Sequence, residues 1–395
     1  MKKLIISAIS LLVLAAGVSL LIMTLLVASC RRSGNDACLP SIVMNEKAET
    51  YPLQLLSDSI DIVDLEANEE GLVGIGIVKC IEYNHRFYLL NQSPRNRNIL
   101  CYDHEGRYLF KIDDIGHGHG EYSIMNDVLI DKVNENLVVS VDHGRCLVYD
   151  LDGNFENQVQ TNIYYPLSFL LMSDSMLFVH RDITEPPFDC MLMQVSYPSF
   201  EVVSKTDKPA ELFGPFGPSP LCQAGDKCLY YNFNDTIYDM TSVEHPVAVY
   251  KVFWGEQNAR QKQKLFKTEK KNHESGMERL QYLLFEEKMP GLGDFYISGD
   301  WMMLNKIELS SGLGRRVENS LFLFHTPTGK TYSLGIRGQV IGVSGSRFVI
   351  ALDMDYYHEN RDEALSLPWF EKQKEIFLTD APEDPNPMLC LIGLM

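Results

Sequence analysis

The sequence lacks the short motifs that identify common enzyme and nucleotide-binding classes. It contains no Gly-x-Ser-x-Gly nucleophile elbow, no complete Gly-x-x-x-x-Gly-Lys-Ser/Thr phosphate loop and no Cys-x-x-Cys pair. The first two absences remove the usual signatures of serine hydrolases and P-loop proteins. The third leaves a zinc ribbon unsupported, because such sites use closely spaced cysteine pairs. The residues that are present indicate architecture and location more than chemistry.

Basic charge is also scarce. The 395 residues carry a formal net charge of −18, and the one basic run lies within residues 260–271. An acidic surface repels phosphate backbones, so we expect no nucleic-acid partner. Glutamates such as Glu269 and Glu274 can pair with the lysines of the basic run, as on the solvated face of a helix. Contact with an anionic membrane or an acidic partner is the alternative interpretation.

The N-terminus has the composition of an export signal. Lysines at positions 2 and 3 precede an uncharged apolar stretch, Leu4 to Ser29, that ends at Cys30. Val-Ala-Ser before this cysteine fits a bacterial lipoprotein signal, in which the thiol receives a diacylglycerol and becomes the new N-terminus. We predict residues 1–29 as the signal peptide and Cys30 as the lipidation site. A transmembrane anchor is the alternative, because an apolar stretch of about 26 residues can span a bilayer.

Either anchor leaves the rest of the chain outside the cytoplasm. Residues 30–52 begin with a polar, mixed composition and are predicted to form a tether, followed by a globular domain over 53–395.

An even number of further cysteines permits disulfides in an exported protein. Four of them lie in apolar runs, where a free thiol behaves as a small hydrophobe: Cys80, Cys101, Cys146 and Cys390. Cys222 and Cys228 are the first candidates for a disulfide, and we expect it to be absent.

One hairpin recurs almost unchanged 47 positions later (146 − 99). Residues 99–108, Ile-Leu-Cys-Tyr-Asp-His-Glu-Gly-Arg-Tyr, align with 146–155, Cys-Leu-Val-Tyr-Asp-Leu-Asp-Gly-Asn-Phe. Each copy is an apolar run, an Asp-x-acid-Gly turn and a second run that opens on an aromatic residue. Periods of about 40–50 residues with several strands each are typical of β-propeller blades. We predict an all-β, six-bladed β-propeller.

The two ends of the domain are expected to close the ring. Ile60–Leu65 precedes the first blade and Met388–Leu394 ends the chain, so pairing them in one sheet would complete the last blade and leave no open sheet edge. Two segments, 256–289 and 361–377, interrupt the strand pattern and are predicted as helical excursions on one face of the propeller.

Three segments carry a family resemblance. Ile115-Gly-His-Gly-His-Gly-Glu-Tyr122 resembles the Ile-Gly-x-Gly-Pro-Gly-Glu-Tyr/Phe element of the six-bladed, NHL-like β-propeller lipoproteins of Bacteroidetes, with His119 in the place of proline. Leu229–Tyr238 resembles the fourth-blade segment of that family, and Asp384–Leu389 resembles its Asn-Pro-Val-Leu ending. The resemblance implies a propeller in the cell envelope and very little chemistry. In lipoproteins of these bacteria, an acidic cluster after the lipidated cysteine resembles a signal for export to the cell surface. Here Cys30 is followed by Arg-Arg-Ser-Gly, without such a cluster. This favours an outer-membrane lipoprotein that faces the periplasm.

Two groups of residues suggest a metal. His117, His119 and Glu121 could hold one ion, but their Gly-x-Gly-x-Gly frame is better explained as a turn between blades that needs positive φ. The acidic hairpin tips, at positions 103, 105, 150 and 152, could suggest calcium. Turn preference explains them without a metal, and they lack the full ligand run of a calcium loop. We therefore expect no cofactor, with calcium as the alternative.

Aromatic residues near the two insertions are the candidate ligand or partner contacts: Trp254, Tyr356, Tyr357 and Trp369. Packing in the core is the alternative, as is usual for aromatics in β-rich folds. The expected function is a lipid-anchored envelope module that binds a small molecule, a glycan or a protein partner, or serves as a scaffold, beside outer-membrane nutrient uptake. A calcium-dependent lactonase or esterase is the alternative, because a fold does not determine an activity. Enzymatic activity therefore stays open, with a binding module favoured.

Overall fold

The chain divides into two compact units, Met1–Pro40 and Ser41–Met395. The structure, a computed structural model, describes residues 39–56, 59–73, 76–92, 97–161, 163, 166–172, 175–180, 192–206, 221–224, 227–232, 235–269, 286–309, 317–365, 367 and 386–394. The predicted signal peptide, Cys30 and the first part of the tether lie outside the described residues. No helix in the described ranges is both long and apolar enough to cross a bilayer.

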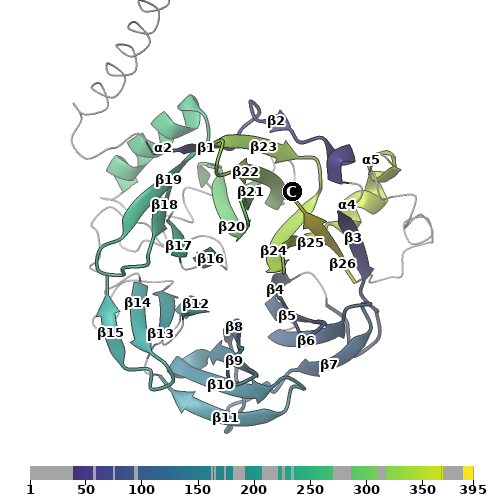
Figure 1. Cartoon of the computed structure of the whole chain (residues 1–395), viewed down its shortest axis with the longest axis vertical. Helices are drawn as coiled ribbons and strands as arrows, with labels where there is room; N and C mark the ends of the chain where they lie inside the picture. Colours follow the sequence, from purple (N-terminus) through teal and green to yellow (C-terminus); the bar gives the residue numbers. More distant parts are fainter. Residues whose placement is uncertain are drawn as a thin grey trace, which may run out of the picture. The chain divides into compact units, whose positions relative to one another are not determined.

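The described strands of the second unit form six sheets arranged around a ring (Figure 1). Sheets 1 and 2 contain β4 (Ile77–Tyr83), β5 (Arg86–Gln92), β6 (Arg97–Asp103) and β7 (Tyr108–Ile112), then β8 (Met125–Asp131), β9 (Asn136–Val141), β10 (Arg145–Asp150) and β11 (Phe155–Gln160). Sheets 3 and 4 contain β12 (Pro166–Leu171), β13 (Ser175–His180), β14 (Leu192–Ser196) and β15 (Val202–Lys205), then β16 (Leu221–Ala224), β17 (Lys227–Asn232), β18 (Thr236–Asp239), β19 (Val247–Phe253) and β1 (Ser41–Val43). Sheets 5 and 6 contain β20 (Gly291–Ser298), β21 (Trp301–Leu309), β22 (Val317–His325), β23 (Lys330–Leu334) and β2 (Glu49–Thr50), then β24 (Gly338–Ser344), β25 (Arg347–Leu352), β26 (Met388–Gly393) and β3 (Ile60–Asp64).

The first strands of the sheets lie innermost and contact one another in cyclic order. β4 contacts β8, β8 contacts β12, β12 contacts β16, β16 contacts β20, β20 contacts β24, and β24 contacts β4. A ring of radially arranged antiparallel sheets is the architecture of a propeller. The predicted all-β propeller is therefore confirmed.

Each sheet is buried on both of its faces by its neighbours. In β5, Tyr88 and Leu90 pack with residues of sheet 2, whereas Phe87 and Leu89 pack with residues of sheet 6. A strand that is buried on both faces needs apolar residues at consecutive positions, not at alternate ones. This explains the continuous run Phe-Tyr-Leu-Leu over 87–90.

The repeated Asp-x-acid-Gly turn joins the third and fourth strands. One Asp103 carboxylate oxygen accepts hydrogen bonds from the backbone of Glu105 and Arg107, both at 2.9 Å, and Asp150 makes the equivalent contacts in sheet 2. Gly106 has φ of 86°, and a Cβ there would lie 2.0 Å from the carbonyl oxygen of Asp64 in sheet 6. The acidic residues thus stabilise turns, and the glycine allows the turn to approach the preceding sheet.

The N-terminal segment pairs with two sheets instead of forming a free tether. β1 pairs in parallel with β19, and β2 pairs in parallel with β23. Ile42 and Met44 are fully buried. The predicted tether over 30–52 is therefore wrong from Ser41 to Thr50, because these residues bury apolar side chains on sheets 4 and 5. The 3₁₀ helix η1 (Leu53–Leu56) then leads to β3.

The early strand β3 and the last strand β26 meet in sheet 6, as predicted from the sequence. β26 lies between β25 and β3 and pairs antiparallel with both. Asn386, just before β26, donates to the carbonyl oxygens of Glu66 at 2.8 Å and Gly71 at 2.7 Å, and accepts from the amide of Val73 at 2.9 Å. This buried side chain ties the C-terminal segment to the loop that leads into sheet 1.

The α-helices within the described residues belong to one face of the ring. Because strands alternate in direction, the connections from second to third strand and from one sheet to the next lie on the same face, here called the loop face. The opposite face, which carries the tight turns, is called the turn face. α2 (Glu256–Glu269) follows β19, and α4 (Met354–Glu359) and α5 (Arg361–Leu365) follow β25, so all three lie on the loop face.

These helices agree only in part with the predicted excursions. α2 begins the excursion predicted over 256–289, and α5 begins that over 361–377, while residues 270–285, 366 and 368–377 are outside the described ranges. α4 was missed, although Asp353 caps it by accepting from the amide of Tyr356 at 3.0 Å. An aspartate before a short helical segment was the available signal.

Replacing Asn386 should weaken the closure of the ring. We expect Asn386→Ala to lower the free energy of unfolding by roughly 3 kcal/mol, because it leaves several backbone groups without their partner at about 1–3 kcal/mol each when buried. Denaturant unfolding measures the loss, and hydrogen exchange should rise first in β26 and β3. Asn157→Ala, at an exposed position of β11, is the control and should change stability by less than about 0.5 kcal/mol. Equal losses in the two variants would contradict the assigned role.

Candidate binding face

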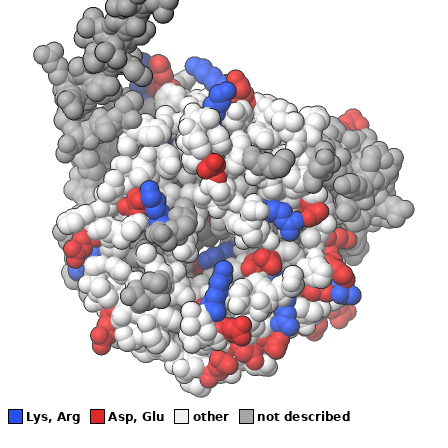
Figure 2. All heavy atoms as spheres, in the orientation of Figure 1, with Lys and Arg blue, Asp and Glu red and all other residues white. Residues whose placement is uncertain are grey.

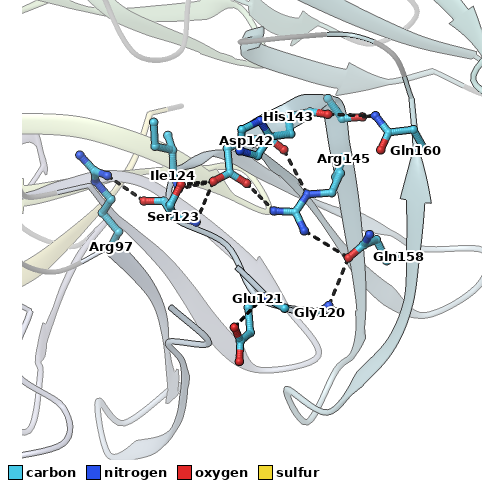
Figure 3. A network of polar contacts seen from close by, with 12 residues as sticks. Arg97, Gly120, Glu121, Ser123, Ile124, Asp142, His143, Arg145, Gln158 and Gln160 are labelled. Atoms are coloured by element: carbon cyan, nitrogen blue, oxygen red, sulfur yellow. Dashed lines mark hydrogen bonds and ion pairs between the residues drawn. The ribbon is translucent and has the colours of Figure 1, made fainter. Parts of the chain in front are cut away.

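Asp142 organises the connections of sheet 2 on the loop face (Figure 3). It lies in the 3₁₀ turn η2 (Asp142–Gly144) between β9 and β10. Its carboxylate accepts from the amides of Ser123 at 2.8 Å and Ile124 at 3.3 Å, and from the Ser123 hydroxyl. Its other oxygen lies 2.5 Å from the Arg145 guanidinium. One buried carboxylate thereby fixes the loop that enters sheet 2 to the turn within it.

Further side chains extend this network across the loop face. The Arg145 guanidinium donates to the Gln158 side-chain oxygen at 3.3 Å, and the same oxygen accepts from the amide of Gly120 at 3.1 Å. The Arg97 guanidinium of sheet 1 donates to the carbonyl of Ser123 at 2.8 Å. Figure 3 shows these residues converging from connections and from the strands β6, β10 and β11. The network joins sheets 1 and 2 and leaves the Asp142 carboxylate fully engaged by donors of the protein itself.

The environment of Asp142 favours its ionised form. Burial by itself raises the pKa of the carboxyl, but hydrogen bonds from Ser123 and Arg145 outweigh this effect and lower the pKa below its ordinary value. A carboxyl that is ionised and enclosed by donors is poorly suited to exchange protons with a substrate.

Asp235 has the equivalent position in sheet 4, between β17 and β18. It accepts from the indole N–H of Trp254 at 2.7 Å and the ammonium of Lys262 at 2.5 Å. The Lys262 side chain is 2 % exposed, and desolvation lowers its pKa although Asp235 opposes the shift. This buried pair holds α2 on the loop face. Lys262 of the basic run therefore points inward, not to solvent.

The predicted aromatic contacts separate into buried and accessible positions. Trp254 and Tyr357 are buried, and the Tyr357 hydroxyl accepts from the amide of Arg337 at 2.8 Å. Tyr356 is half-buried, donates to Glu363 at 2.6 Å and has the Arg337 guanidinium 4.9 Å from its ring centre. Trp369 is outside the described residues. Of the candidates that are described, Tyr356 alone is available to a partner, while the two buried rings serve packing.

The loop that carries His117 and His119, here called the histidine loop, takes its shape from contacts of Glu121. Its carboxylate accepts from the amide of Gly118 at 2.8 Å, and a Cβ at Gly116 would lie 2.0 Å from the same oxygen. His117 and His119 are exposed, and His119 packs edge-on against Phe155. Among the described residues no three His, Cys, Asp or Glu side chains gather as metal ligands would. The predicted positive φ occurs at Gly120, with φ of 80°.

Sequence reasoning missed a chain of polar contacts between the innermost strands. Lys79 of β4 lies 2.9 Å from Asp127 of β8, whose second oxygen accepts from the Ser168 hydroxyl of β12 at 2.9 Å. On the other side of the ring, Gln339 of β24 donates to Asp294 of β20 at 2.9 Å. In the sequence, these contacts could have been recognised from single polar residues within apolar runs. The polar contacts link neighbouring sheets beside the ring centre.

The cysteines in the described ranges are free and buried. Cys222 and Cys228 lie on β16 and β17, where each is paired across the ladder with another residue. Burial raises the pKa of the Cys222 thiol to about 12, so it is unreactive near neutral pH. The predicted absence of a Cys222–Cys228 disulfide agrees with the structure.

Comparison with known families then identifies the domain. The family model described as "Domain of unknown function (DUF4934)" matches residues 39–392. The chain belongs to the DUF4934 family. The match begins before β1, which agrees with the N-terminal strands being part of the propeller.

Solved structures share the fold of this DUF4934 domain. A crystal structure of a protein described as exported, from Bacteroides fragilis NCTC 9343, is 16 % identical, with a TM-score of 0.67 over 90 % of this chain and 99 % of that one. A member of the DUF4221 family from Bacteroides vulgatus ATCC 8482 is 10 % identical, with a TM-score of 0.51 over 85 % of this chain and 98 % of that one. No curated protein matches the chain. At these identities the likeness concerns the fold alone.

The Asp142 network should make the stability of the domain depend on pH. Because the folded pKa is lowered, the unfolded chain binds more protons in the acidic range, and stability rises with pH there. We expect Asp142→Asn to lower the free energy of unfolding by about 1–3 kcal/mol at neutral pH. This difference from wild type should persist above about pH 4 and disappear as the pH falls through the lower folded pKa.

Urea unfolding at several pH values measures this difference. Glu156→Gln is the matched control, because it removes an exposed charge from the same sheet. Its stability should follow the wild type at every pH. A difference between Asp142→Asn and wild type that stays constant from pH 7 to below both pKa values would disprove the assignment.

Proposed function

We propose that this DUF4934 domain is a six-bladed, lipid-anchored propeller of the bacterial cell envelope that binds a partner protein, a small molecule or a glycan through its loop face. Each of the six sheets would be one blade. The cyclic contacts of the innermost strands and the pairing of β26 with β3 support a closed ring of this size. A role beside outer-membrane nutrient uptake belongs to the same proposal.

The N-terminal pattern supports the envelope location. A basic start, an apolar stretch and Val-Ala-Ser-Cys ending at Cys30 fit lipoprotein processing. One structural neighbour is described as exported. The residues after Cys30 lack an acidic cluster, which favours a periplasm-facing orientation.

The binding proposal rests on the position of the two long connections that interrupt the repeated strand pattern. The connections over residues 254–290 and 353–387 both belong to the loop face and carry α2, α4 and α5. The turn face has short hairpins such as Asn84-His85 and residues 151–154. Loops on a rigid scaffold are where proteins place recognition. Figure 2 shows one face of the ring with acidic and basic side chains interspersed and a hollow at the centre.

The same contacts favour recognition over hydrolysis. A calcium-dependent hydrolase would need carboxylate, Asn or His ligands from several sheets to converge and remain open to the ion. On the described loop face, Asp142 and Asp235 are instead occupied by backbone amides, a serine, an arginine, an indole and a lysine. These carboxylates build the scaffold, and binding then depends on the residues that project from it.

Lipidation at Cys30 can be tested by metabolic labelling with an alkyne fatty acid. Wild-type protein should incorporate the label and begin at Cys30 by mass spectrometry, whereas Cys30→Ser should incorporate none and retain residues 1–29. Cys38→Ser is the matched control and should behave as wild type. Unlabelled wild-type protein that retains residues 1–29 would instead identify a transmembrane anchor.

The binding face can be tested with a photo-reactive benzoylphenylalanine in living cells. Placed at His117 or Tyr356 on the loop face, it should give a discrete adduct with an envelope component. Placed at His104 or Val133 on the turn face, where both side chains are exposed, it should give far less. Adducts from the turn-face positions alone, or equal adducts from all four, would refute the assignment of the loop face.

A further inference from the structure

Arg337 is a half-buried cation on the loop face, and no described carboxylate lies within ion-pair distance of it. It directly precedes β24, at the end of the connection between sheets 5 and 6. Five other described arginines each form an ion pair with a carboxylate: Arg86, Arg107, Arg145, Arg260 and Arg347. Arg97 donates instead to the carbonyl of Ser123. The Arg337 guanidinium has neither kind of partner within the described ranges.

The backbone and the side chain of Arg337 are both held in place. Its amide donates to the Tyr357 hydroxyl at 2.8 Å, and its carbonyl accepts from the amide of Asp353 at 3.2 Å. Its guanidinium carbon lies over the Tyr356 ring, 4.9 Å from the ring centre. Arginine stacks on an aromatic ring through the flat face of its guanidinium, so the edge with the N–H donors stays available. These donors are ordered before a ligand arrives, which lowers the entropic cost of binding.

The groups around Arg337 do not neutralise its charge. The Asp353 carboxylate caps α4, and the Glu363 carboxylate accepts from the Tyr356 hydroxyl at 2.6 Å. This second hydrogen bond raises the pKa of Tyr356, although Arg337 opposes the shift, so the phenol is neutral near pH 7. A cation that is partly removed from water without a counter-charge is energetically unfavourable. An anion at the edge of the guanidinium would therefore stabilise this part of the loop face.

The charge of the chain limits which anion fits. A formal net charge of −18 disfavours a large anionic partner, such as a nucleic acid or an acidic membrane surface. One guanidinium balances one negative charge, whereas a phosphate monoester carries about −1.5 to −2 at neutral pH. A carboxylate carries a single charge, and its two oxygens match two parallel N–H donors at the edge of a guanidinium. A small ligand with a carboxylate meets both conditions.

We propose that Arg337 binds the carboxylate of a small acidic ligand, which is either an acidic sugar or a simple organic acid. The carboxylate oxygens accept from the edge of the guanidinium, while Tyr356 supports its face. This role rests on the proposed binding at the loop face and adds the chemical class of the ligand.

Calorimetric titration of the purified full-length chain tests the ligand class. The probes are galacturonate and its short oligomers, the matching neutral galactose compounds, succinate, inorganic phosphate and a glutamate-rich peptide. We expect the sugar acids or succinate to bind at least about tenfold more tightly than the neutral sugars and phosphate, because only they form the paired charge-assisted hydrogen bonds. The acid that binds identifies the source. Equal binding of acidic and neutral sugars, tighter binding of phosphate, or binding of the peptide alone would overturn the proposal.

Substitutions connect the binding to this side chain. Arg337→Gln should weaken binding of the acid at least about tenfold. Arg337→Lys keeps the charge but loses the paired donors, so it should weaken binding less. Arg347→Gln is the matched control, because it removes an arginine at the turn-face end of β25, and it should bind as wild type. Unfolding midpoints should match for all variants. Unchanged binding by Arg337→Gln, or an equal loss in Arg347→Gln, would contradict the assigned contact.

Photo-crosslinking from His117, on the same face, separates this proposal from loop-face binding itself. If the His117 adduct forms and none of the acids binds, the carboxylate class is wrong while loop-face binding stands. If neither occurs, loop-face binding fails as well.

Discussion

The propeller depends on the closure of its ring in sheet 6. Each sheet buries both faces against neighbours, so an unclosed ring would expose two apolar faces as well as open sheet edges. β26 prevents this by pairing with β25 on one side and with β3, from the start of the domain, on the other. Asn386 secures the junction through backbone groups of the loop into sheet 1. The cores on both sides of sheet 6 are complete only after these distant segments have met.

The closed ring provides a frame on which the loop face can vary. Carboxylates at equivalent connections, Asp142, Asp235 and Asp353, each hold the segments that leave the ring. Because they are engaged by the protein itself, they contribute position and not chemistry. A ligand would meet the side chains that project beyond them, such as those of the histidine loop and of α4. A binding module requires a rigid scaffold whose polar groups are already paired within the protein, with exposed loops that are available to a ligand.

Much of the fold was predictable because its signals are local or repeated. The hairpin ending at Gly106 and its copy ending at Gly153 have turn residues whose preferences operate within a few positions. The pairing of β3 with the last strand, β26, followed from the need to close a ring. β1 and β2 were missed because three and two residues are too few to show a strand pattern. For Trp254 and Tyr357 the choice between ligand contact and core packing stayed open, because a sequence does not show which aromatic rings are buried.

The sequence alone determined the repeating strand unit, the acidic turns, the export signal pattern and the two places where the repeat is interrupted. These are properties of neighbouring residues, and the physical preferences that produce them do not depend on the rest of the chain. Only the tertiary structure decided what Asn386, Asp142 and Lys262 do. Their partners lie in other connections of the chain, and a side chain is either a ligand contact or a structural contact according to which distant groups enclose it.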